Sequence, residues 1–233
     1  GLAHGAARLR RGGNHGRRCA LPHVTRRARD PQTDRLQALL PPAQTSPPRI
    51  PAARPRDLGP LARTVAEVSG RITGSGPPNI FTTLGQHPRL FRGWLYYSAH
   101  LMPFGRLPRR DTELVILRVA WQCRSVYEWR QHVPLALRIG LGAEQIETIA
   151  GDDATNGFTD RQRALLAVSD DLLAQRAMSE STWRDARANL TDRELIEACL
   201  LVGHYQGLAS AIGGLAIEPE WCGQTGRQEG DGG

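Results

Sequence analysis

Lysine is absent from this sequence, and all 30 of its basic residues are arginines. The absence excludes chemistry through a lysine Schiff base, and we interpret it as the composition bias of a GC-rich bacterial genome. The positive charge is also unevenly spread. Residues 1–57 hold 12 arginines against three aspartates, whereas residues 58–233 hold 18 against 20 acidic residues. The larger part is nearly neutral and lacks the basic surface of a specific nucleic-acid-binding protein.

Cysteine is scarce, and its spacing excludes several kinds of site. Cys19, Cys123, Cys199 and Cys222 form no Cys-x-x-Cys pair, so neither a zinc-ligand spacing nor a local redox motif is present. Their wide scatter is not typical of a secreted disulfide scaffold, and we expect reduced thiols in the cytoplasm. No apolar run approaches the roughly 18 residues that a membrane span requires, so no membrane partner is predicted.

The distribution of apolar residues predicts one folded unit. Residues 1–57, rich in Arg, Pro and Gly, are expected to be a disordered extension, because they bury too little apolar surface to offset the entropy of ordering. Residues 58–220 show helical spacing and no strand pattern, which predicts a single all-α domain. Residues 221–233 are expected to be a disordered tail. The helical spacing begins with four apolar residues: Leu58, Leu61, Val65 and Val68.

Three of the predicted helices matter for function. Asp111 is expected to cap a helix that is apolar on nearly all sides and therefore buried. Ser125 opens the next helix, and Gly140 ends it. Thr191 and Glu194 form a capping box, Thr-x-x-Glu, for the last long helix.

Four polar side chains in the two central helices are candidates for chemistry. Glu113 lies in the most apolar helix, where a carboxylate needs a partner or its pKa rises. Glu128 and His132 are four residues apart and share a helix face. An imidazole near two carboxylates can shuttle protons near neutral pH. Ser125 and the start of its helix could bind a substrate carboxylate or an enolate.

The same residues also allow purely structural interpretations. Ser125 and Glu128 match a capping box, which would only stabilise the start of the helix. Glu128 and His132 could be an ordinary i,i+4 pair. Glu113 has three nearby arginines as possible ion-pair partners: Arg109, Arg110 and Arg118.

Three further residues are secondary candidates. Cys123 could be a reactive thiol that faces the same site as Glu113 and His132, or it could be a thiol of the core. His204 and Tyr205 lie on the last helix between Gly203 and Gly207, where backbones can approach closely. A histidine there could instead belong to the core or to an interface. No histidine spacing suggests a metal site.

Several motifs resemble the carboxymuconolactone decarboxylase-like family. The resemblance covers roughly residues 48–220, and its most specific part is the element Glu128-Trp129-x-x-His132. The other matching stretches are Pro78–Phe81, His87-Pro88, Leu107-Pro108, Glu113–Ala120, Gly140-Leu141, Glu144–Ile146, His204-Tyr205 and Ile217–Pro219.

The resemblance implies a helical fold that two enzyme types share. One is a cofactor-free decarboxylase that acts on a lactone of aromatic catabolism. The other, the alkylhydroperoxidase D-like group, uses a Cys-x-x-Cys pair with a glutamate and a histidine as proton relay. Glu113 and His132 match the two relay positions, whereas Ser125 and Glu128 occupy the positions of the two cysteines. Members of the family assemble as trimers or hexamers, so a homo-oligomer is expected.

These observations predict a cofactor-free enzyme of decarboxylase type that acts on a small carboxylate or lactone. His132 would be the general acid–base and Glu113 would orient it. Glu128 would share the proton or contact the substrate, and Ser125 would bind an oxyanion. A hydroperoxidase that uses Cys123 with an external reductant is an alternative. A non-catalytic oligomer that binds a small molecule is another.

Overall fold

The computed structural model describes residues 30–41, 47–73, 76–151 and 156–220. Within these ranges the chain forms helices and no strand, which confirms the predicted all-α class. The helices are α1 (Pro31–Ala38), the short 3-10 helix η1 (Pro55–Asp57), α2 (Pro60–Thr73), α3 (Asn79–Leu84), α4 (Pro88–Leu101), α5 (Arg109–Gln122), α6 (Val126–Arg138), α7 (Ala143–Ile149), α8 (Asp160–Gln175), α9 (Glu180–Asn189) and α10 (Asp192–Leu215).

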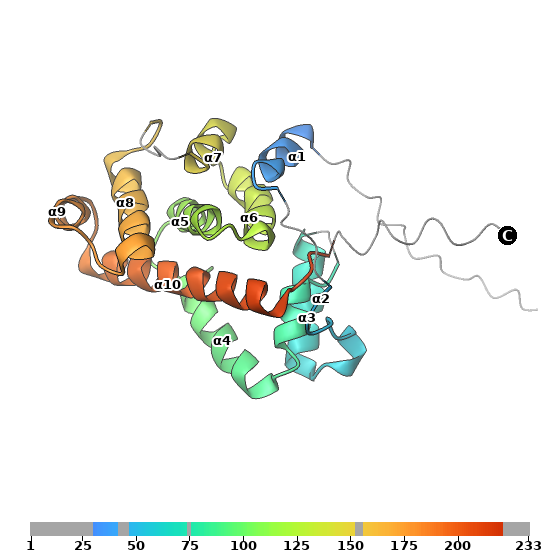
Figure 1. The fold of residues 1–233 in the computed structure, drawn as a ribbon. Helices are drawn as coiled ribbons and strands as arrows, with labels where there is room; N and C mark the ends of the chain where they lie inside the picture. The colour runs from blue at the N-terminus through green and yellow to red at the C-terminus, as the bar shows by residue number, and fades with distance from the viewer. Residues whose placement is uncertain (1–29, 42–46, 74–75, 152–155, 221–233) are drawn as a thin grey trace, which may run out of the picture.

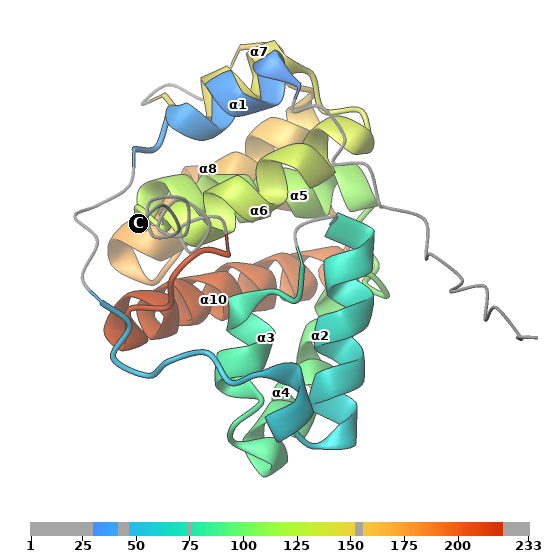
Figure 2. The same ribbon diagram turned by 90° about the vertical axis from the view of Figure 1, so that its right-hand side faces the viewer.

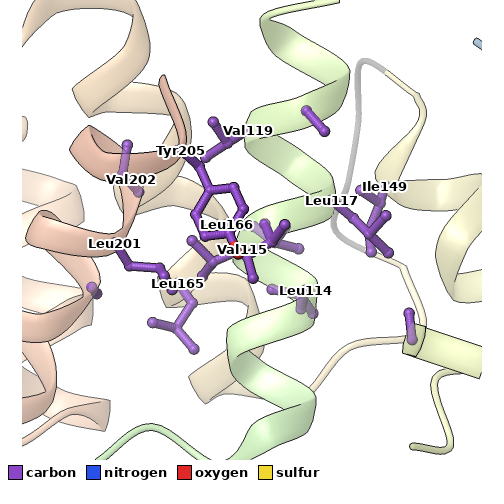
Figure 3. Packing of buried hydrophobic residues seen from close by; sticks show 14 of the residues in the cluster. Leu114, Val115, Leu117, Val119, Ile149, Leu165, Leu166, Leu201, Val202 and Tyr205 are labelled. Atoms are coloured by element: carbon purple, nitrogen blue, oxygen red, sulfur yellow. The ribbon is translucent and has the colours of Figure 1, made fainter. Parts of the chain in front are cut away.

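Helix α5 lies at the centre of the molecule, with α6, α8 and α10 packed around it (Figure 1). Every residue from Asp111 to Ala120 is buried, which agrees with the prediction of a helix that is apolar on nearly all sides. Figure 3 shows how side chains of α5, α8 and α10 interlock in this core. The labelled members from these three helices are Leu114, Val115, Leu117, Val119, Leu165, Leu166, Leu201, Val202 and Tyr205.

Helix α10 begins with the predicted capping box, in which the Thr191 hydroxyl accepts from the amide of Glu194 and the Glu194 carboxylate accepts from the amide of Thr191. Its 24 residues are long and apolar enough to cross a bilayer by length and composition alone. In this fold, however, α10 packs against α5 and α8, and its buried face includes Leu201 and Tyr205. We therefore assign α10 as a core helix of the domain.

Helices α2, α3 and α4 lie on the opposite side of α10 from α5, α6 and α8 (Figure 2). The predicted apolar stripe of α2 is only partly buried, because Leu61 and Val68 remain 44% and 46% exposed. Ala62 and Ala66 are buried instead. The small residues let α2 approach its neighbours closely and leave the larger side chains on the surface.

The expectation of disorder throughout residues 1–57 is wrong for residues 30–41, which include helix α1. It is also wrong for residues 47–57, which include η1 and bond to the end of α10 through Arg49. Asp30 caps α1 and Pro31 occupies its first turn, both of which favour a helix start. Leu36 and Leu40 lie four residues apart and are buried in the main core against α6 and α7. Residues 1–29 and 221–233 lie outside the described residues.

Candidate functional site

A tight turn brings the candidate residues of α5 and α6 together. Only residues 123–125 separate the two helices, and Arg124 adopts the left-handed conformation with φ 54°. The chain therefore turns sharply and α6 packs along α5. As a result, Nδ1 of His132 lies 2.7 Å from Oε2 of Glu113, although the residues come from different helices. The predicted pairing of acid and imidazole is present.

The carboxylate of Glu113 is fully buried and contacts a cation as well as the imidazole. Nη2 of Arg109 lies 2.6 Å from its Oε1, which satisfies the need of a buried acid for a partner. Of the three arginines considered from the sequence, Arg109 is the ion-pair partner. Both Arg109 and Arg110 lie on the helix face of Glu113, at i,i+4 and i,i+3, but Arg110 instead donates to the side-chain oxygen of Gln145. Arg118 instead donates to both oxygens of Asp170.

The contact with Glu113 fixes the role of each nitrogen of His132. A carboxylate accepts hydrogen bonds, so Nδ1 carries the proton that faces Glu113 and Nε2 is left for proton transfer. The His132 side chain keeps 10% of its surface exposed, whereas that of Glu113 keeps none. The imidazole therefore stands between the buried acid and the outside of the domain.

Glu128 is buried beside this pair without a comparable partner. Neither of its oxygens has a hydrogen-bond partner among the described residues, and its residue exposure is 2%. Burial raises the pKa of Glu128 to about 7, and the nearby Ser125 hydroxyl and His132 only partly offset this effect. At neutral pH the carboxyl group is thus close to half protonated and can either give or take a proton.

The structural interpretations of Ser125 and Glu128 fit the geometry poorly. Ser125 is the N-cap residue of α6, but its side chain makes no capping hydrogen bond, so the predicted capping box is absent. His132 directs Nδ1 to Glu113 rather than to Glu128, so an ordinary i,i+4 pair does not describe the contact either.

Several buried polar atoms around the acid–imidazole pair lack hydrogen-bond partners within the described part of the chain. They are Nη1 of Arg109, Oγ of Ser125 and both carboxyl oxygens of Glu128. Unsatisfied buried polar atoms are rare in folded proteins and need an explanation. A cationic donor, a hydroxyl and a carboxyl are thus available as groups with which a small polar ligand could bond.

Tyr205, a secondary candidate, lies in the site. Its ring stands edge-on to that of His132, with 5.4 Å between the ring centroids, and its hydroxyl donates to the sulfur of Met102 at 3.6 Å. Burial raises the pKa of Tyr205 well above its ordinary value, and the charges of Glu113 and Glu128 raise it further. The phenol therefore stays neutral and forms a wall of the site.

His204, by contrast, faces α4. Its Nε2 lies 3.2 Å from the hydroxyl oxygen of Ser98, and its ring stacks on Trp94 with 6.2 Å between centroids. Burial lowers the pKa of His204, which favours the neutral imidazole. These contacts agree with the interpretation of His204 as a histidine of the interior.

Cys123 ends α5 and is half-buried against the main core. Burial raises the pKa of its thiol, the negative charge of Glu128 raises it further, and Arg176 offsets only part of this. Because the thiolate is the form that attacks a peroxide, this environment disfavours peroxidase chemistry at Cys123.

Two clefts open on the surface away from the acid–imidazole pair. One, of about 730 Å³, lies at the start of α10 and includes Arg106, Arg187 and Arg193 in its lining. The other, of about 650 Å³, lies between α9 and α10. Neither cleft includes Glu113 or His132 in its lining. Across the described residues, no three His, Cys, Asp or Glu side chains gather to hold a metal ion.

Comparisons with solved structures identify the class of fold. The alkylhydroperoxidase AhpD core structure of a peroxidase-related protein from Ralstonia eutropha JMP134 has a TM-score of 0.63 and 20% identity, over 75% of this chain and 93% of that one. A peroxidase-related protein from Silicibacter sp. TM1040 has a TM-score of 0.65 and 16% identity, over 77% and 94%. The debrominase Bmp8 has a TM-score of 0.64 and 13% identity, over 73% and 91%. The fold is therefore the all-helical AhpD-like fold.

Part of the sequence also matches a known family. Residues 88–171, from the start of α4 into α8, match the carboxymuconolactone decarboxylase family. This confirms the resemblance inferred from the motifs, and the matched segment contains Glu113, Glu128 and His132. No protein of curated function matches the sequence.

Proposed function

We propose that this protein is a cofactor-free acid–base enzyme of decarboxylase type that acts on a small carboxylate or lactone. One observation carries the proposal: Nδ1 of His132 lies 2.7 Å from the buried carboxylate of Glu113, beside Glu128, whose pKa burial raises to about 7. A carboxyl group with a pKa near neutral pH, beside an imidazole that a carboxylate orients, is what general acid–base catalysis requires.

In the proposed reaction, the bond between the substrate and its carboxylate carbon breaks and carbon dioxide leaves. The electron pair passes into the substrate as an enolate, whose oxygen would accept hydrogen bonds from Oγ of Ser125 and the first turn of α6. The Glu128 carboxyl, or His132 after its Nε2 has taken up a proton from solvent, then donates the proton that forms the new C–H bond, and solvent reprotonates the donor. Arg109, through Nη1, would bind a second anionic group of the substrate.

The comparisons support a small, ring-shaped substrate. The matching family is named for a lactone decarboxylase, and a variant of the Bmp8 debrominase was crystallised in complex with 2,3,4-tribromopyrrole. Because Ser125 and Glu128 stand where thiol enzymes of this fold carry their cysteines, we favour decarboxylation over thiol chemistry. We further propose that the enzyme works in the cytoplasm as a homo-oligomer.

The test is a decarboxylation assay of the full chain on a panel of carboxylated lactones, with carbon dioxide release as the measurement. The variant His132→Ala is expected to lower kcat by about 100-fold or more, the range typical of a lost general acid–base. His100→Ala is the matched control, because His100 is exposed and bonds only the carbonyl of Tyr96 on its own helix. Equal turnover in His132→Ala and the unaltered chain overturns the assignment.

A small-molecule-binding protein without catalysis is the second candidate. It is favoured by the position of the two surface clefts, neither of which includes the acid–imidazole pair in its lining. Thermal-shift screening with the same lactones separates the two candidates. Tight binding without carbon dioxide release supports the binding protein, whereas turnover supports the enzyme.

A further inference from the structure

Helix α6 contains a proline in its interior, close to the candidate catalytic residues. Pro134 lies two residues after His132. Proline has no amide hydrogen, so Pro134 cannot donate the i→i−4 hydrogen bond that the carbonyl of Arg130 would otherwise accept. The backbone hydrogen bonding of α6 is therefore weakened in the segment that contains Glu128 and His132.

Helix α1 supplies a donor at this point. The side-chain Nε2 of Gln37 donates to the carbonyl oxygen of Arg130 at 2.6 Å. A second hydrogen bond runs from α6 to α1: the indole Nε1 of Trp129, one residue before Arg130, donates to the carbonyl oxygen of Leu36 at 2.9 Å. Leu36 lies in the last turn of α1, and its carbonyl also accepts from the amide of Leu39 at 3.3 Å. Each helix thus donates from a side chain to a backbone carbonyl of the other.

Apolar packing surrounds these hydrogen bonds. Leu36, Leu40 and Trp129 are each at most 2% exposed, so water competes poorly for the buried bond from Trp129, whereas the bond from Gln37 is part-buried. Arg35 adds an ion pair with Glu147 of α7 at the edge of the contact. Helix α1 lies upstream of the segment that matches the family model.

We infer that α1 stabilises the backbone of the proline-containing helix α6 through the hydrogen bond from Gln37 to Arg130, a contact that we call the brace. We further infer that Gln37 is a positioning residue for Glu128 and His132. Gln37 acts through the carbonyl of Arg130, and Trp129 ties the same turn to α1. The positioning role rests on the proposed function, whereas the brace itself does not.

A double-mutant cycle tests the brace in the full-length chain. Gln37→Ala removes the donor, whereas Pro134→Ala gives α6 its own amide hydrogen for the Arg130 carbonyl. Gln37→Ala is expected to speed hydrogen exchange of the amides in residues 126–138 by about fivefold to tenfold, the effect of one lost hydrogen bond. The same change in the Pro134→Ala background is expected to have little effect, because the helix no longer needs the external donor.

Two further variants separate donation from packing. Gln37→Glu has nearly the same shape without the amide donor and is expected to behave as Gln37→Ala does. Gln32→Ala is the matched control, because Gln32 is an exposed glutamine of the same helix. Equal effects of Gln37→Ala in both backgrounds, or unchanged exchange in α6, overturn the brace.

The positioning role has its own readout, which needs no substrate. In 15N-histidine-labelled protein, Gln37→Ala is expected to move the imidazole resonances of His132 in the natural background and not in Pro134→Ala. Faster exchange of α6 with an unmoved His132 signal overturns the positioning role and leaves the brace intact. Because neither measurement involves turnover, failure of the brace and failure of the proposed decarboxylation are distinguishable.

Discussion

At the scale of single residues, the site is defined by how differently its two glutamates are buried. Glu113 contacts both Arg109 and His132, whereas neither oxygen of Glu128 has a hydrogen-bond partner among the described residues. A buried carboxyl group without a partner favours its protonated form. In the proposed function, Glu113 is therefore the fixed acceptor and Glu128 the proton donor or acceptor.

The raised pKa of Glu128 predicts a pH-dependent stability. Between the ordinary value of 4.5 and about 7, the native state holds a proton that the unfolded chain has lost, so stability falls as pH rises through this window. The full effect is about 3 kcal/mol. Glu128→Gln should remove it, so that the stability advantage of the variant grows from pH 4.5 to 7 and then levels off. Guanidinium denaturation at a series of pH values measures this.

Glu144→Gln is the control for that series, because Glu144 is an exposed glutamate on α7. Its stability difference from the unaltered chain should not follow the same curve. A difference for Glu128→Gln that stays constant across the series would show that Glu128 has no raised pKa.

The environment of Cys123 leads to a second prediction at this scale. Burial and the charge of Glu128 raise the pKa of its thiol, so little thiolate is available to attack a peroxide. Cys123→Ser is expected to leave any peroxide consumption unchanged, and sulfenic-acid trapping after peroxide treatment should not label Cys123. Labelling of Cys123 together with lost turnover in the serine variant would revive the hydroperoxidase alternative.

The sequence predicted the pairing of Glu113 with His132, because a glutamate in a fully apolar helix needs a partner and the next helix carried an imidazole. It did not predict that the Ser125 side chain would make no capping hydrogen bond. The sequence motif of a capping box is present whether or not the hydroxyl forms that bond. Side-chain rotamers of this kind depend on packing between helices, which local sequence does not specify.

At the scale of helices, an ion pair between the buried Arg118 and the partly exposed Asp170 links α5, which carries Glu113, to its neighbour α8. The guanidinium of Arg118 in α5 donates to both carboxylate oxygens of Asp170 in α8 and to the carbonyls of Ile149 and Gly151 at the end of α7. Arg118 is 2% exposed. Its network therefore joins the central helix to two neighbours.

Removing the Arg118 network should strongly destabilise the fold. Arg118→Met is expected to lower the free energy of unfolding by about 2–4 kcal/mol, mainly because the carbonyls of Ile149 and Gly151 lose their donor. Chemical denaturation measures the change, and Arg138→Met on the exposed end of α6 is the control. A loss below about 1 kcal/mol for Arg118→Met would mean that the network contributes little.

The position of α1 shows where sequence-based prediction of the helices fails. The helices of the domain have long apolar patterns and clear caps, so their existence could be predicted. Helix α1 has only eight residues within an Arg-, Pro- and Gly-rich context. Its stability comes from the surface that α6 and α7 present to Leu36 and Leu40, and composition alone does not reveal a tertiary contact of this kind.

At the scale of the whole molecule, several large apolar side chains remain on the surface. Ile72 of α2 is 61% exposed, Tyr96 of α4 is 72% exposed and Phe104 is 78% exposed. Exposed apolar residues that gather on a face are a common feature of protein–protein interfaces.

The expectation of a homo-oligomer stays a prediction, and sedimentation measures it directly. We expect a mass of three or six times 25.6 kDa. Tyr96→Asp and Phe104→Asp are expected to lower the sedimenting mass, with Leu39→Asp, a change on the α1 side of the molecule, as control. A single species at the mass of one chain contradicts the expectation.

The most direct measurement is the 15N spectrum of His132 in histidine-labelled protein, taken with and without the change Glu113→Gln. We expect the neutral imidazole to carry its proton on Nδ1, with Nε2 bare, and we expect this preference to weaken in Glu113→Gln. A proton on Nε2 in the unaltered chain would contradict the proposal that Glu113 orients His132. An unchanged His132 spectrum in Glu113→Gln would contradict it as well.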